Sequence, residues 1–419
     1  MKDGMNQDWQ RVEGGRAMPD QPLSDVKVLD LTWYIAGPYC TKLLADYGAD
    51  VIKVERPGTG DPARRMGPFL GDDPNPEKSG LFLHLNTNKR GITLNLKTNT
   101  GKKILKELVK DADILMENFS PRVMPSLGLA YEELEKINPR LVMTSISNFG
   151  QTGPYRDFKA SDLILYGMGG SMYCNGVPER YPLKKGGTVT PYQGGNHAAA
   201  ATMVAFIGSR LQGTGQQVDI SLFETQAGSI DRRMSNLVGY IYNKEVTPRL
   251  GPQGLGFPYG AYPCKDGYFD VAGGLSFWPR IPRMLGMPEL LHDPRFSTGE
   301  GQARAGSREE FDAIFLPWVM QRTKKECVEA GQAGGALCGP VSSMRDLLGD
   351  FHWKAREFWV DIEHPVAGKL TYPGAPIRME TPFRIRRPAP LLGQHNEEVY
   401  AALGYSKDDL VKLRERGVV

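Results

Sequence analysis

The chain has 419 residues, of which 24% are charged and 40% hydrophobic, and its formal net charge is +3. This composition argues against disorder and favours a globular protein of two or three domains. The balance of 51 basic and 48 acidic residues argues against nucleic acid as a partner, and no apolar run is long enough for a membrane span. The polar N-terminus has no hydrophobic signal core, so we expect a cytoplasmic protein.

After a polar arm over residues 1–24, the pattern predicts alternating strands and helices. Apolar and β-branched runs predict strands over residues 26–32, 51–55, 91–96, 112–116 and 141–146. Apolar side chains at helical spacing predict helices after Pro38, after a cap at Asn99 or Thr100, over 131–137 and through the alanine-rich run 197–210. Successive strand–helix–strand units predict an α/β fold with a Rossmann-like sheet that is parallel at its core.

The second half of the chain predicts a smaller α+β domain. A Gly-, Pro- and Tyr-rich stretch precedes short strands and helices, and a final helix is expected over residues 406–416. The expected organisation is a polar arm, a large domain, a linker, a small domain and a return segment that rejoins the large domain. Their ranges are 1–24, 25–225, 226–266, 267–345 and 346–419.

Ligands of open α/β sheets bind at the carboxyl ends of the strands. The loops to inspect therefore follow Thr32, Glu55, Glu117 and Ser147. The sequence contains no dinucleotide GxGxxG, phosphate loop, HExxH or GxSxG motif. Its five cysteines and six histidines are scattered, which predicts neither disulfides nor a metal site. These residues alone indicate only an α/β protein.

Several longer segments, in a fixed order along the chain, are more specific. They are LLADYGADVIKVERP (43–57), NTNKRGITLNLK (86–97), ENFSP (117–121), FGQTGPY (149–155), GTGQQVD (213–219) and PLLGQH (390–395). Through them the chain resembles the class III CoA-transferases, the family of formyl-CoA transferase and the carnitine and bile-acid CoA-transferases. The resemblance implies a Rossmann-like large domain built from both ends of the chain, a small domain between them, and two subunits that interlock as a dimer.

The resemblance also implies that the large domain binds coenzyme A as a substrate, with no permanently bound cofactor. The positions that match the family's CoA contacts are Tyr34, Ala36, Arg56, Leu94, Lys97, Asn118 and Phe119. By the same analogy Trp33 lines the entry to this pocket, whereas Ser126 stands where some relatives carry an arginine. Lys89 and Arg90 either contact a phosphate or lie in a solvated turn.

The family's chemistry depends on an aspartate whose carboxylate attacks the acyl-CoA thioester. Counting back 25 residues from Gln216 to the family's position of this aspartate lands on Pro191, and the sequence has no carboxylate from Thr188 to Phe206. Proline has no side-chain nucleophile, so we expect no catalytic residue in this chain. Racemases of this fold use a histidine before an aspartate, but here Ser161 precedes Asp162, which we expect to be structural, as we do His197.

Three hypotheses follow. In the first, the chain is the non-catalytic subunit of a heteromeric class III CoA-transferase, and a paralogous subunit supplies the aspartate. That enzyme would move CoA from an acyl-CoA donor, with succinyl-CoA favoured, to a carboxylic acid such as benzylsuccinate, an intermediate of anaerobic toluene degradation. In the second, the chain is a homodimeric acyl-CoA isomerase or lyase with altered catalytic groups. In the third, it is a non-enzymatic acyl-CoA-binding protein.

Overall fold

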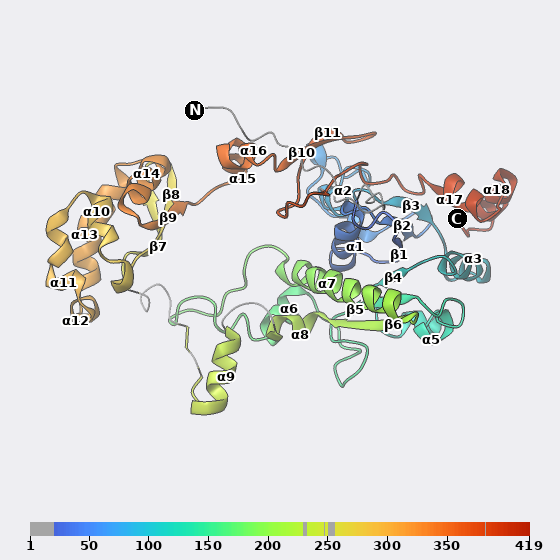
Figure 1. Cartoon of the computed structure of the whole chain (residues 1–419), viewed down its shortest axis with the longest axis horizontal. Helices are drawn as coiled ribbons and strands as arrows, with labels where there is room; N and C mark the ends of the chain where they lie inside the picture. Colours follow the sequence, from blue (N-terminus) through green and yellow to red (C-terminus); the bar gives the residue numbers. More distant parts are fainter. Residues whose placement is uncertain (1–20, 229–232, 247, 250–255, 382) are drawn as a thin grey trace, which may run out of the picture. The chain divides into compact units, whose positions relative to one another are not determined.

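The computed structural model describes residues 21–228, 233–246, 248–249, 256–381 and 383–419 (Figure 1). The chain folds into two compact units, each assembled from separate segments. Unit 1 takes the residues up to Lys159 together with Thr190–Leu222 and Phe358–Val419, and unit 2 takes Ala160–Val189 and Phe223–Glu357. Most of the expected polar arm, residues 1–20, lies outside the described residues.

Unit 1 contains, among its described residues, a six-stranded parallel sheet in the order β3-β2-β1-β4-β5-β6. The strands are β1 (Lys27–Asp30), β2 (Asp50–Glu55), β3 (Arg90–Thr93), β4 (Ile114–Glu117), β5 (Val142–Ser147) and β6 (Gln216–Ser221). This is the strand order of the doubly wound Rossmann fold. It confirms the predicted Rossmann-like sheet, and it places the reversal of strand order between β1 and β4.

Alternation along the strands sends apolar side chains to both faces of this sheet. On one face Val28, Val51 and Val142 pack against α1 (Ala36–Asp46) and α7 (Val189–Gln212), which runs along β5 and β6 (Figure 1). The opposite face is covered by α3 (Asn99–Val109), α4 (Val123–Ser126) and α5 (Tyr131–Leu134). The cap of α3 is Thr98, whose hydroxyl accepts the Gly101 N–H at 2.9 Å, so the predicted cap at Asn99 or Thr100 was wrong.

The C-terminal segment of unit 1 lies against β3, the strand at one end of the sheet order. Its elements are the hairpin β10 (Trp359–His364) and β11 (Gly368–Pro373), then α17 (Asn396–Ala402) and α18 (Lys407–Glu415). Asn396 Oδ1 accepts the Thr93 N–H at 2.9 Å, and the Tyr400 hydroxyl donates to the Thr93 carbonyl at 2.7 Å. The Asn95 N–H donates to the carbonyl of Val418 at 2.8 Å. Residues from both ends of the chain therefore complete unit 1.

Unit 2 is the smaller α+β part of the fold. Its described strands form an antiparallel sheet in the order β7-β8-β9, with β7 (Tyr259–Cys264), β8 (Gly267–Ala272) and β9 (Leu337–Pro340). Its helices are α6 (Asp162–Met168), α9 (Arg233–Asn243), α10 (Arg280–Leu285), α11 (Pro294–Ser297), α12 (Gly299–Ala303), α13 (Ser307–Met320), α14 (Lys324–Gly334), α15 (Met344–Gly349) and α16 (Phe351–Ala355), while α8 (Leu222–Gly228) begins at its boundary. The core is aromatic, with Phe257, Trp278, Phe296, Phe311 and Phe315 buried together.

The unit boundaries differ from the expected domain ranges. Residues 160–189, expected in the large domain, cluster with unit 2, where the guanidinium of Arg249 donates to the carbonyls of Tyr173 and Val177. The expected linker 226–266 includes helix α9 and strand β7. None of the described helices is both long and apolar enough to cross a membrane.

Candidate functional site

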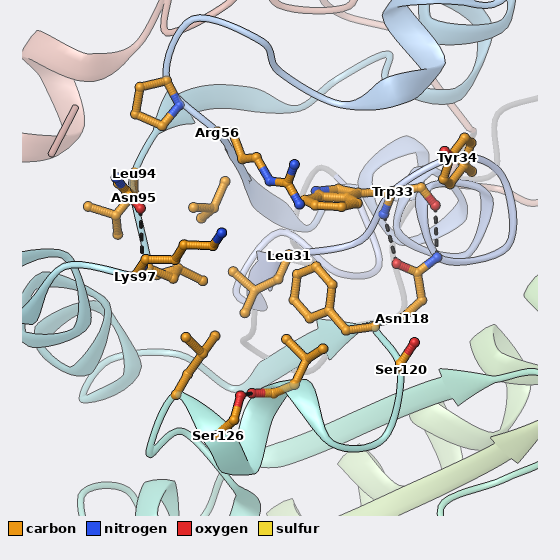
Figure 2. Close-up of a pocket in the computed structure, with 16 residues that line it drawn as sticks. Leu31, Trp33, Tyr34, Arg56, Leu94, Asn95, Lys97, Asn118, Ser120 and Ser126 are labelled. Carbon is orange, nitrogen blue, oxygen red and sulfur yellow. Dashed lines mark hydrogen bonds between the residues drawn. The ribbon is translucent and has the colours of Figure 1, made fainter. Parts of the chain in front are cut away.

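A cavity of about 680 Å³ opens at the carboxyl ends of β1, β2, β3 and β4, at the reversal of strand order (Figure 2). Its lining residues are Leu31, Trp33, Tyr34, Val54, Arg56, Pro57, Leu94, Asn95, Leu96, Lys97, Asn118, Phe119, Ser120, Val123, Ser126 and Leu127. The volume is in the range of small-molecule sites, roughly 300–1,000 Å³. Three of the loops singled out from the sequence, those after β1, β2 and β4, contribute to it, and the loop after β5 does not.

The cavity brings together six of the seven residues predicted to bind CoA. They are Tyr34, Arg56, Leu94, Lys97, Asn118 and Phe119. The seventh, Ala36, is buried at the start of α1 and does not line the cavity. Its carbonyl oxygen lies against Gly195 of α7, where a Cβ would come within 2.6 Å of it. Ala36 therefore marks the close approach of α1 and α7.

Trp33, Arg56 and Phe119 form a cluster of one cation and two aromatic rings in the cavity. The Arg56 guanidinium lies over the Trp33 ring, 4.0 Å from its centroid, as Figure 2 shows. The Phe119 ring meets Trp33 edge to face, with the centroids 5.2 Å apart. This stacking orients the guanidinium and adds a cation–π attraction of about 0.5–2 kcal/mol. With Lys97, Arg56 supplies the positive charge of the lining, which suits a ligand that carries phosphates and an aromatic ring.

Asn118 holds the backbone of Trp33 through both ends of its side-chain amide. Its Oδ1 accepts the Trp33 N–H, and its Nδ2 donates to the Trp33 carbonyl, each at 2.8 Å (Figure 2). These two bonds fix the turn that follows β1. Asn118 thus contributes to the cavity chiefly by orienting Trp33, a role that could not be predicted because the two residues are 85 positions apart in the sequence.

Lys89 and Arg90 lie away from the cavity lining. Lys89 is completely buried, and its Nζ bonds to Asp30 Oδ2 at 2.9 Å and to the carbonyl of Pro38 at 3.0 Å, so both alternatives predicted for it were wrong. Although burial alone would raise the pKa of Asp30, Lys89 and Lys53 hold it well below its usual range. Arg90 bonds to Asp50 and Glu398 and ties β3 to its neighbours.

Ser126 lies in the lining but brings no charge to it. Its hydroxyl donates to the carbonyl of Val123 at 2.8 Å, within the short helix α4 (Figure 2). The absent arginine therefore leaves Arg56 and Lys97 as the cationic side chains of this lining. A ligand with several phosphates has fewer charged partners here than the family pattern implies.

Pro191 lies in the first turn of α7, a helix whose sequence contains no carboxylate. The neighbouring Tyr192 packs edge to face on Tyr39 of α1, with centroids 4.9 Å apart. The Nδ1 of His197 donates to the carbonyl of Gln193 at 2.8 Å, one turn earlier in the same helix. Asp162 belongs to unit 2 and forms an ion pair with Lys184 at 2.6 Å. No group of three His, Cys, Asp or Glu side chains suited to a metal occurs in the described part of the chain.

Glu117 is a buried carboxyl group that sequence reasoning did not select. It ends β4, accepts the Phe119 N–H at 2.8 Å, and so supports the loop that carries Asn118 and Phe119. Burial raises its pKa to about 7, against the lowering effect of hydrogen bonds from Ser145 and Phe119. The signal available in the sequence was its place at the end of an apolar strand, where a carboxylate has no obvious partner.

We expect the Glu117→Gln variant to remove a pH dependence of stability. Because the folded-state pKa exceeds the unfolded one, this carboxyl contributes stability that is complete below about pH 4.5 and is lost as pH rises through about 7. As pH rises from about 4.5 to about 7, the free energy of unfolding of the wild type should fall by about 2–4 kcal/mol relative to that of the variant. Urea unfolding of both proteins from pH 4.5 to 8.5 measures this difference, and parallel curves would contradict it.

The geometry defines a Rossmann-like protein with a ligand cavity at the reversal of its strand order. The chain matches the family described as CoA-transferase family III over residues 23–396. It is 34% identical over 409 residues to the succinyl-CoA–D-citramalate CoA-transferase of Chloroflexus aurantiacus, covering 96% of this chain and 99% of that protein. It is 32% identical over 405 residues to the succinyl-CoA:glutarate CoA-transferase of Homo sapiens, covering 95% and 90%.

A solved CAIB/BAIF family protein from Brucella suis has a similar structure, with a TM-score of 0.80 and 31% identity over 91% of this chain and 99% of that one. The chain therefore belongs to CoA-transferase family III. This confirms the family predicted from the sequence segments, and it supports transferase activity with CoA as a substrate. The interlocked dimer stays a prediction.

Proposed function

We propose that this chain is the non-catalytic subunit of a heteromeric family III CoA-transferase and that its cavity holds the CoA part of an acyl-CoA. The observation that carries the proposal is a combination within unit 1. The cavity keeps cationic and aromatic side chains at Arg56, Lys97, Trp33 and Phe119, while the position expected for the nucleophile is Pro191. A chain that keeps these cationic and aromatic side chains but lacks the nucleophilic carboxylate binds CoA without catalysing its transfer.

The lining matches the chemistry of CoA. Guanidinium and ammonium groups suit its phosphates, because bonds between opposite charges are shorter and stronger than neutral ones. The rings of Trp33 and Phe119 and the side chains of Leu31 and Leu94 provide apolar surface for the adenine. Arg56, already stacked on Trp33, is the side chain from which we expect the largest single contribution to affinity.

The missing carboxylate supports a partner subunit. In the family's reaction an aspartate oxygen attacks the thioester carbon, the carbon–sulfur bond breaks, and CoA leaves as the thiolate while a mixed anhydride forms. At the corresponding place Pro191 offers no oxygen, and burial raises the pKa of Tyr192 and of Tyr39 beside it, which keeps these phenols protonated. A paralogous subunit with the aspartate would supply this step, and we expect the two subunits to interlock.

We also propose a CoA donor and a CoA acceptor. The names of two relatives, from Chloroflexus aurantiacus and Homo sapiens, specify succinyl-CoA with D-citramalate or glutarate. These names support succinyl-CoA as the donor and a dicarboxylic acid as the acceptor. Benzylsuccinate belongs to that chemical class and is our proposed acceptor.

Titration calorimetry with CoA tests the binding part. The chain should bind CoA, and Arg56→Ala should weaken binding about ten- to a hundredfold, since a hydrogen bond to a charged group contributes about 1.5–3 kcal/mol. The loss should be larger at low salt, where screening is least. Arg140→Ala, an exposed arginine outside the cavity lining, is the matched control and should bind like the wild type.

Two results would contradict the binding proposal. One is the absence of detectable binding at millimolar CoA, and the other is an Arg56→Ala variant that binds as tightly as the wild type. The partner is tested by co-expression with an aspartate-containing paralogue, which should yield one complex with both chains. If size-exclusion chromatography of the mixture gives only separate homo-oligomers, the heteromer is wrong.

A further inference from the structure

Tyr34, in the cavity lining, has an unusual backbone conformation. Its φ is +64°, in the left-handed region that residues other than Gly, Asn and Asp rarely adopt. The residue is half exposed, so burial of its ring does not impose this conformation. Left-handed residues persist only where the surroundings hold them, and they concentrate at ligand sites. The contacts of the turn around Tyr34 must therefore hold it in this conformation.

Asp61 holds the backbone of Tyr34 directly. Its Oδ1 accepts the Tyr34 N–H at 3.0 Å and also the Ala63 N–H at 2.9 Å, where it caps the 3₁₀ turn Pro62–Arg65. Asp61 is completely buried, and its own N–H donates to Glu55 Oε2 at 2.8 Å. Asp61 is thus held in place by contacts other than its bond to Tyr34.

Lys53 also supports the turn, through Asp61 and through the backbone of Thr32. Its Nζ lies 2.9 Å from Asp61 Oδ2 and donates to the carbonyl of Thr32 at 2.9 Å, and its side chain has no exposed surface. Together with the clamp of Asn118 on Trp33, side chains from three different segments hold three consecutive residues of the turn. None of these supports depends on a ligand, so the turn is preformed.

We infer that Asp61 is a positioning residue for CoA: by accepting the Tyr34 N–H it holds the turn in the left-handed form that presents Trp33 and Tyr34 to the cavity. This inference rests on the proposed CoA site. Asp61 does not line the cavity, so its effect on the ligand is transmitted through the backbone of Tyr34. Lys53 neutralises its charge in the interior and keeps the oxygen available to the turn.

The test uses CoA titration calorimetry on folded full-length variants. Asp61→Ala should lower CoA affinity about five- to tenfold, as expected for one lost hydrogen bond. Asp61→Asn, whose amide oxygen can still accept the Tyr34 N–H, should retain affinity within about threefold. Glycine adopts the left-handed form freely, so adding Tyr34→Gly to Asp61→Ala should recover the affinity of Tyr34→Gly alone. A purely structural defect would not be rescued in this way.

A second pair of variants leaves the buried charges intact. Tyr34→Gly and Tyr34→Val both remove the ring, but valine disfavours the left-handed form, so Tyr34→Val should bind CoA about tenfold more weakly than Tyr34→Gly. This pair decides the question if Asp61→Ala does not fold. Equal binding of the pair, or wild-type affinity in folded Asp61→Ala, overturns the inference. If the wild type itself does not bind CoA, the proposed function fails instead.

Discussion

Assayed alone with succinyl-CoA and a dicarboxylic acid, the purified chain should transfer no CoA above the uncatalysed background. The reason is chemical: the first turn of α7 presents Pro191, and the whole helix lacks a carboxylate to form the anhydride. Chromatographic detection of the product thioester over time measures the rate. In complex with an aspartate-containing paralogue, the same assay should show turnover.

The control for this assay is the complex in which the partner's aspartate is replaced by asparagine. It should assemble normally and lose turnover, because assembly does not need the carboxylate. Steady-state transfer by the lone chain, together with an enzyme adduct that hydroxylamine cleaves, would contradict a non-catalytic role.

The Arg64→Ala variant should be about 3–5 kcal/mol less stable than the wild type, since removing one partner of a buried ion pair leaves an uncompensated charge. Arg64 has no exposed surface, and its guanidinium bonds to both oxygens of Glu55 at 2.7 and 2.8 Å. It also bonds to Glu77 at 2.7 Å and lies 3.7 Å from the centroid of the Phe82 ring. Denaturant unfolding monitored by circular dichroism measures the loss.

Arg122→Ala is the matched control for Arg64→Ala. Arg122 also forms a two-bond pair with a carboxylate, that of Asp157, but its side chain is largely exposed to solvent. Exposed pairs contribute little, so this variant should unfold almost like the wild type. Equal destabilisation of the two variants would show that burial does not determine the strength of the Arg64 cluster.

Five of the six strands of the sheet were predictable because their signal is local, although the predicted strand 91–96 extends three residues past the end of β3, and no strand was predicted at β6. Runs such as residues 51–55 and 141–146 are apolar and β-branched. Their predicted ends lie within one residue of the observed ends of β2 and β5. Their parallel order follows from the helices between them. The cap of α3 was misplaced by one or two residues because Thr98, Asn99 and Thr100 all have side chains that can cap a helix.

The buried charges could not be predicted in the same way. Lys53 in the middle of β2 has the pattern of a solvent-facing residue, and its burial depends on Asp61, which arrives from a later loop. Lys89 is buried for the same reason: its charge is paired with that of Asp30, which lies 59 positions away in the sequence. A single sequence does not show such long-range pairs, whereas the resemblance of whole segments located the cavity residues. Binding of CoA by those residues stays a prediction.

The contacts of the C-terminal segment also constrain the order in which the protein can be completed during synthesis. Thr93 and Asn95 flank Leu94 of the cavity lining, and their partners Asn396, Tyr400 and Val418 are translated more than 300 residues later. Unit 2 ends at Glu357, so its residues leave the ribosome before this part of the lining has its supports. We therefore expect a released chain that ends at Glu357 to resist proteolysis within unit 2 while the region around Thr93 remains cleavable.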